Sequence, residues 1–195
     1  MLFRSHHLHV EWLATQFDMK VVVTVRHPAA FVSSIKALNW PHDFRSFASQ
    51  PLLMEHILEP FAEEILAYAS DPPGDIVDRS ILFWKCGYHV IGKYREAHPD
   101  WLFVRHEDLS RAPADRFREL FKHLGLDFGA RTKDYVMEHT TAPERSGELQ
   151  PAGKIKRNSL AQTTKWKSLL TAEEVERIRT RLEPWWRPFY SDEDW

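Results

Sequence analysis

Residues 20–38, KVVVTVRHPAAFVSSIKAL, decide the fold of this chain. Its run of valines has no polar alternation, which is typical of a strand buried on both faces in a parallel sheet. Pro28 stands where the first position of a helix tolerates a missing N–H, and the apolar residues after it recur at helical spacing. The stretch therefore predicts a buried strand that turns directly into a helix. Arg26 at this turn places a cation beside free backbone N–H groups, which favours anion binding.

The composition describes one ordinary globular domain. The chain has 195 residues, of which 43% are hydrophobic and 28% charged, and its net charge is −2. A chain of this length buries a sizeable core, and its near-neutral balance predicts no nucleic-acid partner. No apolar run approaches the length of a membrane span, and the first residues lack the apolar core of a signal peptide. We therefore expect no membrane span and a cytoplasmic location.

The single cysteine, Cys86, excludes an intramolecular disulfide and a cysteine-rich metal cage. The histidines lack the HxxxH and HExxH spacings of metal ligands, so we predict no metal site. Cys86 itself is expected to be a small, buried, apolar side chain.

Later segments predict helices around a second short strand, residues 101–104. The expected helices are 52–69 with a break at Pro60, 76–98, 113–124 closed by Gly125, 131–139, and a last helix opened by a capping box at 171–174. Two strands, each followed by helices, predict an α/β fold with a small parallel sheet covered by many helices. Such a sheet is short of strands, and we expect the missing ones N-terminal to Met1.

We predict a single domain over residues 1–195. Within it, the polar segment 144–170 is expected to be a mobile loop region. The segment 185–195 is an aromatic and acidic tail, which we expect to pack against the body of the protein.

Four stretches, in order along the chain, resemble the sulfotransferases that use 3′-phosphoadenosine 5′-phosphosulfate (PAPS). They are VVVTVRHPAAFVSS (21–34), WLFVRHEDLSRAP (101–113), MEHTTAP (137–143) and KIKRNSLAQTTKWKSLLTAEEVERI (154–178). The resemblance implies the three-layer core of that family, which is related to P-loop NTPases. It also implies an enzyme that transfers a sulfuryl group from PAPS, without a metal, to a hydroxyl or amine acceptor.

The resemblance further implies a donor site. Arg26 and Ser34 correspond to the Arg and Ser that bind the 3′-phosphate of the donor in this family, and His106 replaces a Tyr that contacts adenine. Guanidinium suits a phosphate because it can bind it in a bidentate manner. The remaining implied donor-site residues are Thr140 and Thr141 beside the adenine, and Lys156 and Arg157 over the 3′-phosphate.

Each of these residues also has a structural interpretation. Arg26 could form a salt bridge with a structural carboxylate, and Ser34 could be a hydroxyl on a helix surface. Glu107 and Asp108 are expected to cap the following turn or to pair with an Arg rather than to form an acid–base pair. Aromatic residues at helical spacing, such as Trp84 and Tyr88, are expected in the core rather than in an acceptor pocket.

His6 and His7 are the candidates for the base that takes the proton of the acceptor. They lie about where the family carries a His or Glu, ahead of the strand that ends at Arg26. A neutral imidazole near its own pKa suits this task. The alternative is a solvated terminal segment, since three histidines fall within residues 6–9.

The sequence departs from the family in one respect. It contains no G-x-x-x-x-G-K-[ST] motif, whose backbone N–H groups, Lys and hydroxyl would hold the phosphosulfate end of the donor. Two functions follow: a sulfotransferase impaired by the absence of this loop, or a non-catalytic, truncated relative that acts as a binding or assembly module. A small-molecule or carbohydrate acceptor fits the first function. A sheet without its first strand would also expose an edge through which a homo-oligomer could form.

Overall fold

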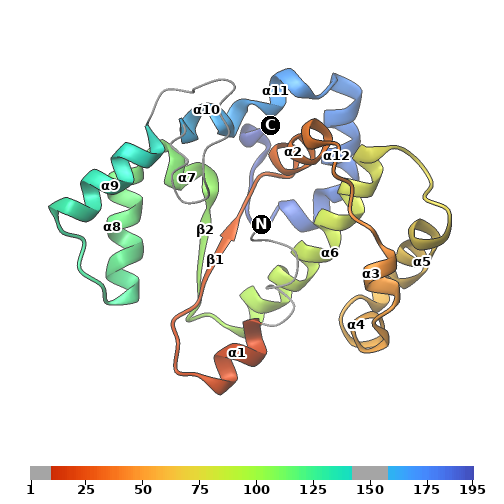
Figure 1. The fold of residues 1–195 in the computed structure, drawn as a ribbon, viewed down its shortest axis with the longest axis horizontal. Coiled ribbons are helices and arrows are strands. Elements are labelled where there is room, and N and C mark those ends of the chain that lie inside the picture. Colours follow the sequence, from red (N-terminus) through yellow and green to blue (C-terminus); the bar gives the residue numbers. More distant parts are fainter. Residues whose placement is uncertain (1–9, 142–157) are drawn as a thin grey trace.

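The computed structural model describes residues 10–141 and 158–195. At its centre, strand β1 (Val22–Val25) pairs in parallel with strand β2 (Leu102–Arg105), in a register that sets Val22 opposite Leu102 and Val25 opposite Arg105. Figure 1 shows the two strands side by side, with the helices distributed around them. The predicted α/β class with a small parallel sheet covered by helices is confirmed, although helices dominate the described residues.

Burial along β1 alternates. Val23 and Val25 are buried, whereas Thr24 is exposed. The prediction of a strand buried on both faces is therefore wrong for β1, because the described part of the chain covers only one face of it. Pairing of this sheet with another chain stays a prediction.

Helix α2 (Pro28–Leu38) follows β1 after two residues. Pro28 occupies its first position as predicted, and the helix ends at Asn39, which adopts a left-handed conformation with φ 45°. The helix packs against the long helix α6 (Ile76–Ala97) and against α12 (Ala172–Trp186). These three helices carry much of the core, including Val32, Ile81 and Leu182, and they support the end of β1 from one side.

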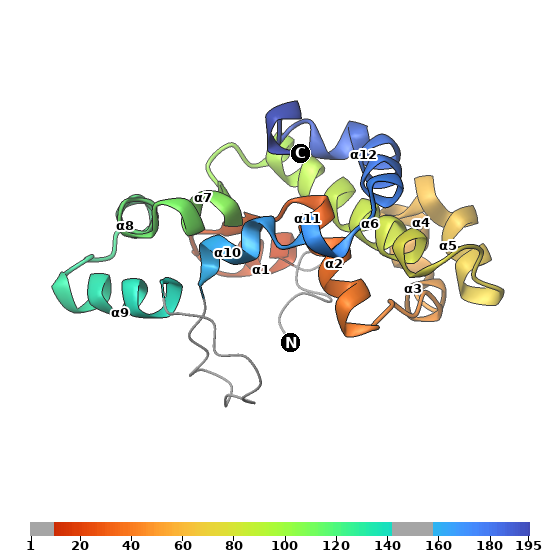
Figure 2. The same ribbon diagram turned by 90° about the horizontal axis from the view of Figure 1, so that it is seen from above.

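The shorter helices surround this centre. They are α1 (Val10–Gln16), α3 (Arg45–Ala48), α4 (Pro51–His56), α5 (Ala62–Ser70), α7 (His106–Arg111), α8 (Pro113–Leu124), α9 (Ala130–Thr140), α10 (Ser159–Thr164) and α11 (Trp166–Leu169), with 3-10 turns η2 (Glu59–Phe61) and η3 (Asp192–Asp194). In Figures 1 and 2, α8 and α9 extend from one side of the molecule and α3 to α5 cover the other.

Several local predictions are confirmed. Pro60 interrupts the helical stretch between α4 and α5, and Gly125 closes α8 with φ 73°. A capping box joins Thr171 and Glu174 at the start of α12. Residues 76–97 form the expected long helix, in which Cys86 is buried.

The described residues at the C-terminal end of the chain, 158–195, are mostly helical. The described residues of the segment predicted as a mobile loop, 144–170, form α10 and α11. Thr163 and Trp166 are buried, so these short helices contribute to the packed body. The aromatic tail 185–195 packs against it as well, through buried Trp186 and Tyr190.

Candidate functional site

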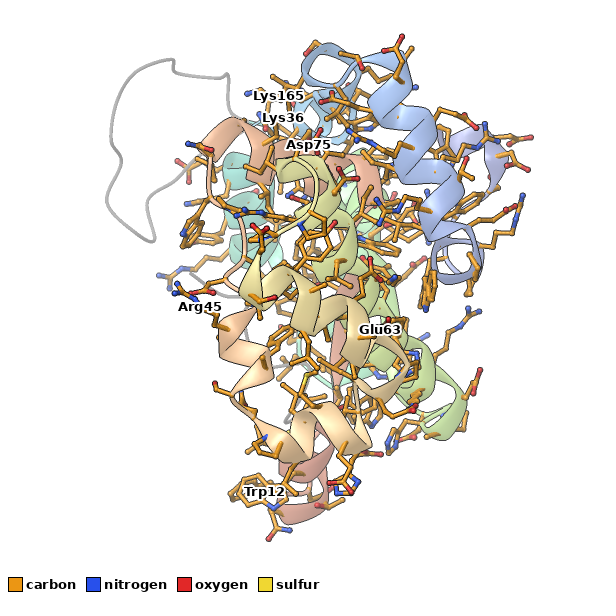
Figure 3. The ribbon with its side chains drawn as sticks, turned by 90° about the vertical axis from the view of Figure 1, so that its right-hand side faces the viewer. Trp12, Lys36, Arg45, Glu63, Asp75 and Lys165 are labelled. Carbon is orange, nitrogen blue, oxygen red and sulfur yellow. The ribbon has the colours of Figure 1, made fainter. Side chains whose placement is uncertain are left out.

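The candidate site lies where the two parallel strands end. Since Val25 faces Arg105 in the register, the next residues, Arg26 and His106, leave the sheet side by side. Figure 3 shows Lys36 and Lys165 at this end of the molecule, whereas Trp12 of α1 lies at the opposite end. Ligands of open parallel sheets bind beyond the carboxyl ends of the strands, which makes this edge the expected position for a donor nucleotide.

The backbone of Arg26 is held by side chains of α6. Its N–H donates to the Tyr88 hydroxyl at 2.5 Å, and its carbonyl accepts from that hydroxyl at 2.7 Å and from the Trp84 indole at 3.4 Å. Both aromatic rings are buried and stack on each other with centroids 3.5 Å apart. Trp84 and Tyr88 are thus core residues, as predicted, and they also fix the turn from which the Arg26 side chain departs.

A carboxylate of the protein itself binds the backbone at the start of α2. The N–H of His27 donates to Glu107 Oε1 at 3.0 Å, and the Tyr190 hydroxyl donates to Glu107 Oε2 at 3.0 Å. Glu107 is only 4% exposed. The expectation that free backbone N–H groups stand ready for a ligand at this turn is therefore wrong for His27, because a buried carboxylate occupies that position.

The His27 ring is enclosed by aromatic side chains. It stacks on Trp166 at 5.3 Å between centroids and meets Tyr190 and Trp195 edge-on at 5.1 and 4.5 Å. Neither ring nitrogen has a hydrogen-bond partner. Burial in this cage lowers the pKa of His27 to about 3, so the imidazole is neutral at physiological pH and acts in packing rather than as a cation.

His106 opens α7 beside Arg26. Burial lowers its pKa, the Glu107 carboxylate partly opposes this effect, and the Arg26 charge adds to it. The His106 Nδ1 atom is buried without a hydrogen-bond partner. A buried ring nitrogen without a hydrogen-bond partner is uncommon in folded proteins.

Three predicted hydroxyl groups bond within their own helices. Ser34 Oγ donates to the Ala30 carbonyl at 2.9 Å, Thr140 Oγ1 to the Val136 carbonyl at 2.7 Å, and Thr141 Oγ1 to the Met137 carbonyl at 2.7 Å. Each oxygen keeps lone pairs, but its hydrogen is engaged. To donate to a phosphate or a base, each hydroxyl must turn away from its helix.

Helix α10 brings the later motifs to the strand ends. An isolated antiparallel bridge joins Thr141 to Asn158, whose side chain caps α10 by accepting the N–H of Ala161 at 3.1 Å. The helix then packs on α7 and α2. Helix α10 therefore connects Thr140 and Thr141 to the edge that carries Arg26 and His106.

The C-terminal tail packs against the end of β2. Asp194 accepts two hydrogen bonds from Arg105, at 2.5 and 3.2 Å. Burial alone would raise the pKa of Asp194, but hydrogen bonds from Ser191 and Arg105 hold it below its usual range. A small pocket remains between the tail, α7 and the α10–α11 segment, lined by His27, Glu107, Arg111, Thr163, Thr164, Trp166, Lys167, Glu193 and Asp194.

Other predicted residues lie elsewhere. His6, His7, Lys156 and Arg157 fall outside the described residues. Asp108 pairs with Arg111 at 3.4 Å and Arg105 at 3.6 Å, as predicted for this position. Glu107 caps the start of α2 rather than the turn that follows it.

Within residues 10–141 and 158–195, no three His, Cys, Asp or Glu side chains form a group that could hold a metal ion. None of the helices in the same residues is both long and apolar enough to cross a membrane.

The sequence did not predict that residues of the C-terminal tail bind the residues at the strand ends. Tyr190 and Asp194 lie 83 and 89 residues from their partners Glu107 and Arg105. No spacing rule connects such positions. The only available signal was the aromatic and acidic composition of the tail, which predicted packing but no specific partner.

The parallel strands, the Arg at the end of β1 and the helix after it define a sulfotransferase-like domain. The model of the sulfotransferase domain matches residues 1–188, and the chain belongs to this family. Carbohydrate sulfotransferase 3 of Rattus norvegicus is 30% identical over 74 residues, which are 35% of this chain and 15% of that protein. The match thus spans a minor part of the relative. No solved structure matches the chain significantly.

Proposed function

We propose that this protein binds PAPS at the carboxyl ends of β1 and β2 and transfers its sulfuryl group to a hydroxyl of a carbohydrate. In this reaction the acceptor oxygen forms a bond to sulfur, the bond from sulfur to the phosphate oxygen breaks, and a base takes the acceptor proton. The electron pair leaves with adenosine 3′,5′-bisphosphate.

The observation that carries the proposal is the joint position of Arg26 and His106 beyond the strand ends in a chain of this family. In the proposed complex, Arg26 binds the 3′-phosphate through charge-assisted hydrogen bonds, which are the strongest the side chain can offer. Ser34 adds a neutral hydrogen bond to the same phosphate. His106 faces the adenine, and Thr140 and Thr141 approach it from α9.

The carbohydrate acceptor is the finer part of the proposal. It rests on the carbohydrate sulfotransferase that matches part of this chain. A screen of mono- and disaccharides, simple alcohols and phenols with labelled PAPS tests it. Transfer to alcohols or phenols, and not to sugars, would contradict this part alone.

Titration calorimetry with adenosine 3′,5′-bisphosphate tests the donor site. Because hydrogen bonds to charged groups contribute about 1.5–3 kcal/mol, we expect Arg26→Ala to weaken binding by on the order of 10- to 100-fold. Arg118→Ala, which removes an exposed partner of Asp115 on α8, is the matched control and leaves the affinity unchanged. Equal affinities of wild type and Arg26→Ala would contradict the assignment of Arg26.

The base is proposed to be His7 or His6. Loss of a general base lowers turnover by about 100-fold or more. Alanine variants at the two positions, assayed with saturating donor, identify which imidazole acts. If both variants retain full turnover, neither is the base.

The second candidate function is binding without transfer, which the absence of the phosphate-loop motif from these 195 residues favours. A chain of this kind would bind adenosine 3′,5′-bisphosphate but release no sulfate to any acceptor. Detectable transfer from labelled PAPS by the purified protein would eliminate it.

A further inference from the structure

We infer that Glu107 is a positioning residue: held by Tyr190 of the C-terminal tail, it fixes the β1–α2 turn so that Arg26 points into the donor site. The inference rests on the proposed function and adds to it a pair of residues that touch neither the donor nor the acceptor.

Both oxygens of Glu107 are engaged, one by the His27 N–H and the other by the Tyr190 hydroxyl, each at 3.0 Å. The side chain is buried, and its negative charge lies at the positive end of the α2 dipole. The two oxygens join the backbone at the start of α2 to the hydroxyl of the tail residue, which assigns this carboxylate the role of holding the backbone.

His27 directly follows Arg26 and is the residue that caps α2. The Arg26 N–H and carbonyl are fixed from α6, and the His27 N–H is fixed from α7. The guanidinium therefore starts from a turn that is anchored on both sides. Loss of the Glu107 anchor leaves a buried N–H without an acceptor, which a small rotation of the turn would relieve.

The C-terminal tail binds residues of both β2 and α7. Tyr190 binds Glu107, Asp194 binds Arg105 in a bidentate manner, and Trp195 packs on the His27 ring. Burial raises the pKa of Tyr190 well above its usual value, so its hydroxyl keeps the proton that it donates to Glu107. One short segment thus connects the end of β2 to the start of α2 across the two strand ends.

The experiment compares affinities for two ligands in calorimetry of the full chain: adenosine 3′,5′-bisphosphate and adenosine 5′-monophosphate, which lacks the 3′-phosphate. Their ratio reports the 3′-phosphate contact, and a general loss of structure would lower both affinities together. We expect Glu107→Ala to lower the ratio about tenfold, since an unsatisfied buried group costs about 1–3 kcal/mol. Tyr190→Phe lowers it about threefold, because only one supporting hydrogen bond is lost.

Rescue and coupling sharpen the test. Glu107→Gln keeps an acceptor for the His27 N–H and restores the ratio to within about twofold of wild type. In the background of Arg26→Ala, Glu107→Ala lowers the ratio no further, because the two residues act through one contact. The matched controls are Glu119→Gln on α8 and Tyr135→Phe on α9, two exposed side chains on the helices that extend from one side of the molecule. Both leave the ratio unchanged.

Each failure has a distinct outcome. If wild type shows no preference for the ligand with the 3′-phosphate, the donor site itself is absent and both proposals fall. If Arg26→Ala removes the preference but Tyr190→Phe and Glu107→Ala leave it intact, only the positioning role is overturned. A rise of the ratio in Glu107→Gln would also overturn it, since the carboxylate would then compete with the phosphate. If Glu107→Ala does not fold, Tyr190→Phe and Glu107→Gln decide the question.

Discussion

The β1–α2 turn carries Arg26, and the α8–α9 arm ends at Thr140 and Thr141, yet the two regions are built differently. Arg26 and His27 in the turn are fixed by buried side chains from α6, α7 and the tail. In the arm, the buried residues of the two helices are Pro113 and Val136. Its ion pairs, such as Arg118 with Asp115, are exposed to solvent. Figure 2 shows α8 and α9 extending away from the body.

Buried partners around the turn, and their scarcity in the arm, indicate which of the two regions is organised before a ligand binds. A turn whose backbone groups are bonded to buried partners holds its side chains in one geometry. An arm with few buried contacts and exposed ion pairs opens at low free energy. We therefore expect the 3′-phosphate contact to dominate binding and the contacts from Thr140 and Thr141 to contribute less.

The largest difference is expected in stability. Trp84→Ala removes a fully buried indole that stacks on Tyr88, and truncation of a core aromatic costs about 3–5 kcal/mol of the free energy of unfolding. Phe121→Ala on α8 removes a half-buried ring packed on Phe128 and should cost about 1 kcal/mol. Urea denaturation of both variants measures the difference. Equal losses would show that the arm is as well packed as the turn.

The next difference concerns pH. The pKa of His27 is about 3 in the folded protein and near 6.5 in an unfolded chain, so between these values only the unfolded form takes up the proton. Folding stability therefore falls as the pH falls, by up to about 1.4 kcal/mol per pH unit from this group. His27→Phe keeps a ring in the aromatic cage. It should reduce the slope of the unfolding free energy against pH, between pH 6 and 4, by the amount that about one bound proton contributes.

The control for this measurement is the exposed His56 of α4. The stability profile of His56→Gln is measured in the same range, so that the effect of the buried ring is compared with that of an exposed one. If His27→Phe has the wild-type slope, the imidazole is hydrated or paired in solution and the turn is less closed than the structure indicates.

The smallest expected effect concerns the arm. Thr140→Ala and Thr141→Ala each remove a hydroxyl that already bonds to its own helix, so each should weaken binding of adenosine 3′,5′-bisphosphate by no more than about threefold. Calorimetry beside the Arg26 variant gives the ranking. A loss as large as that of Arg26→Ala would mean that the arm closes firmly on the ligand and would reverse the comparison.

Much of the local structure could be predicted because it depends on neighbours in the chain. Pro28 and Asn39 bound α2, Gly125 ends α8, and the capping box at Thr171 starts α12. Each signal acts within one or two turns of helix, where the chain itself sets the distance between residues. The helices in segment 159–169 were harder to predict from the sequence. They depend on the burial of Thr163 and Trp166 rather than on a clear local period of apolar residues.

Residues close together in the chain were enough to predict the strand, turn and helix that carry Arg26, and four ordered motifs were enough to predict the family. The surroundings of that turn come from tertiary packing: the Glu107 carboxylate at the start of α2, the Tyr190 hydroxyl that holds it, and the aromatic cage of His27. These partners lie far apart along the chain. Hydrogen bonds between residues 80 or more positions apart follow from the packing of whole elements, which no local pattern encodes.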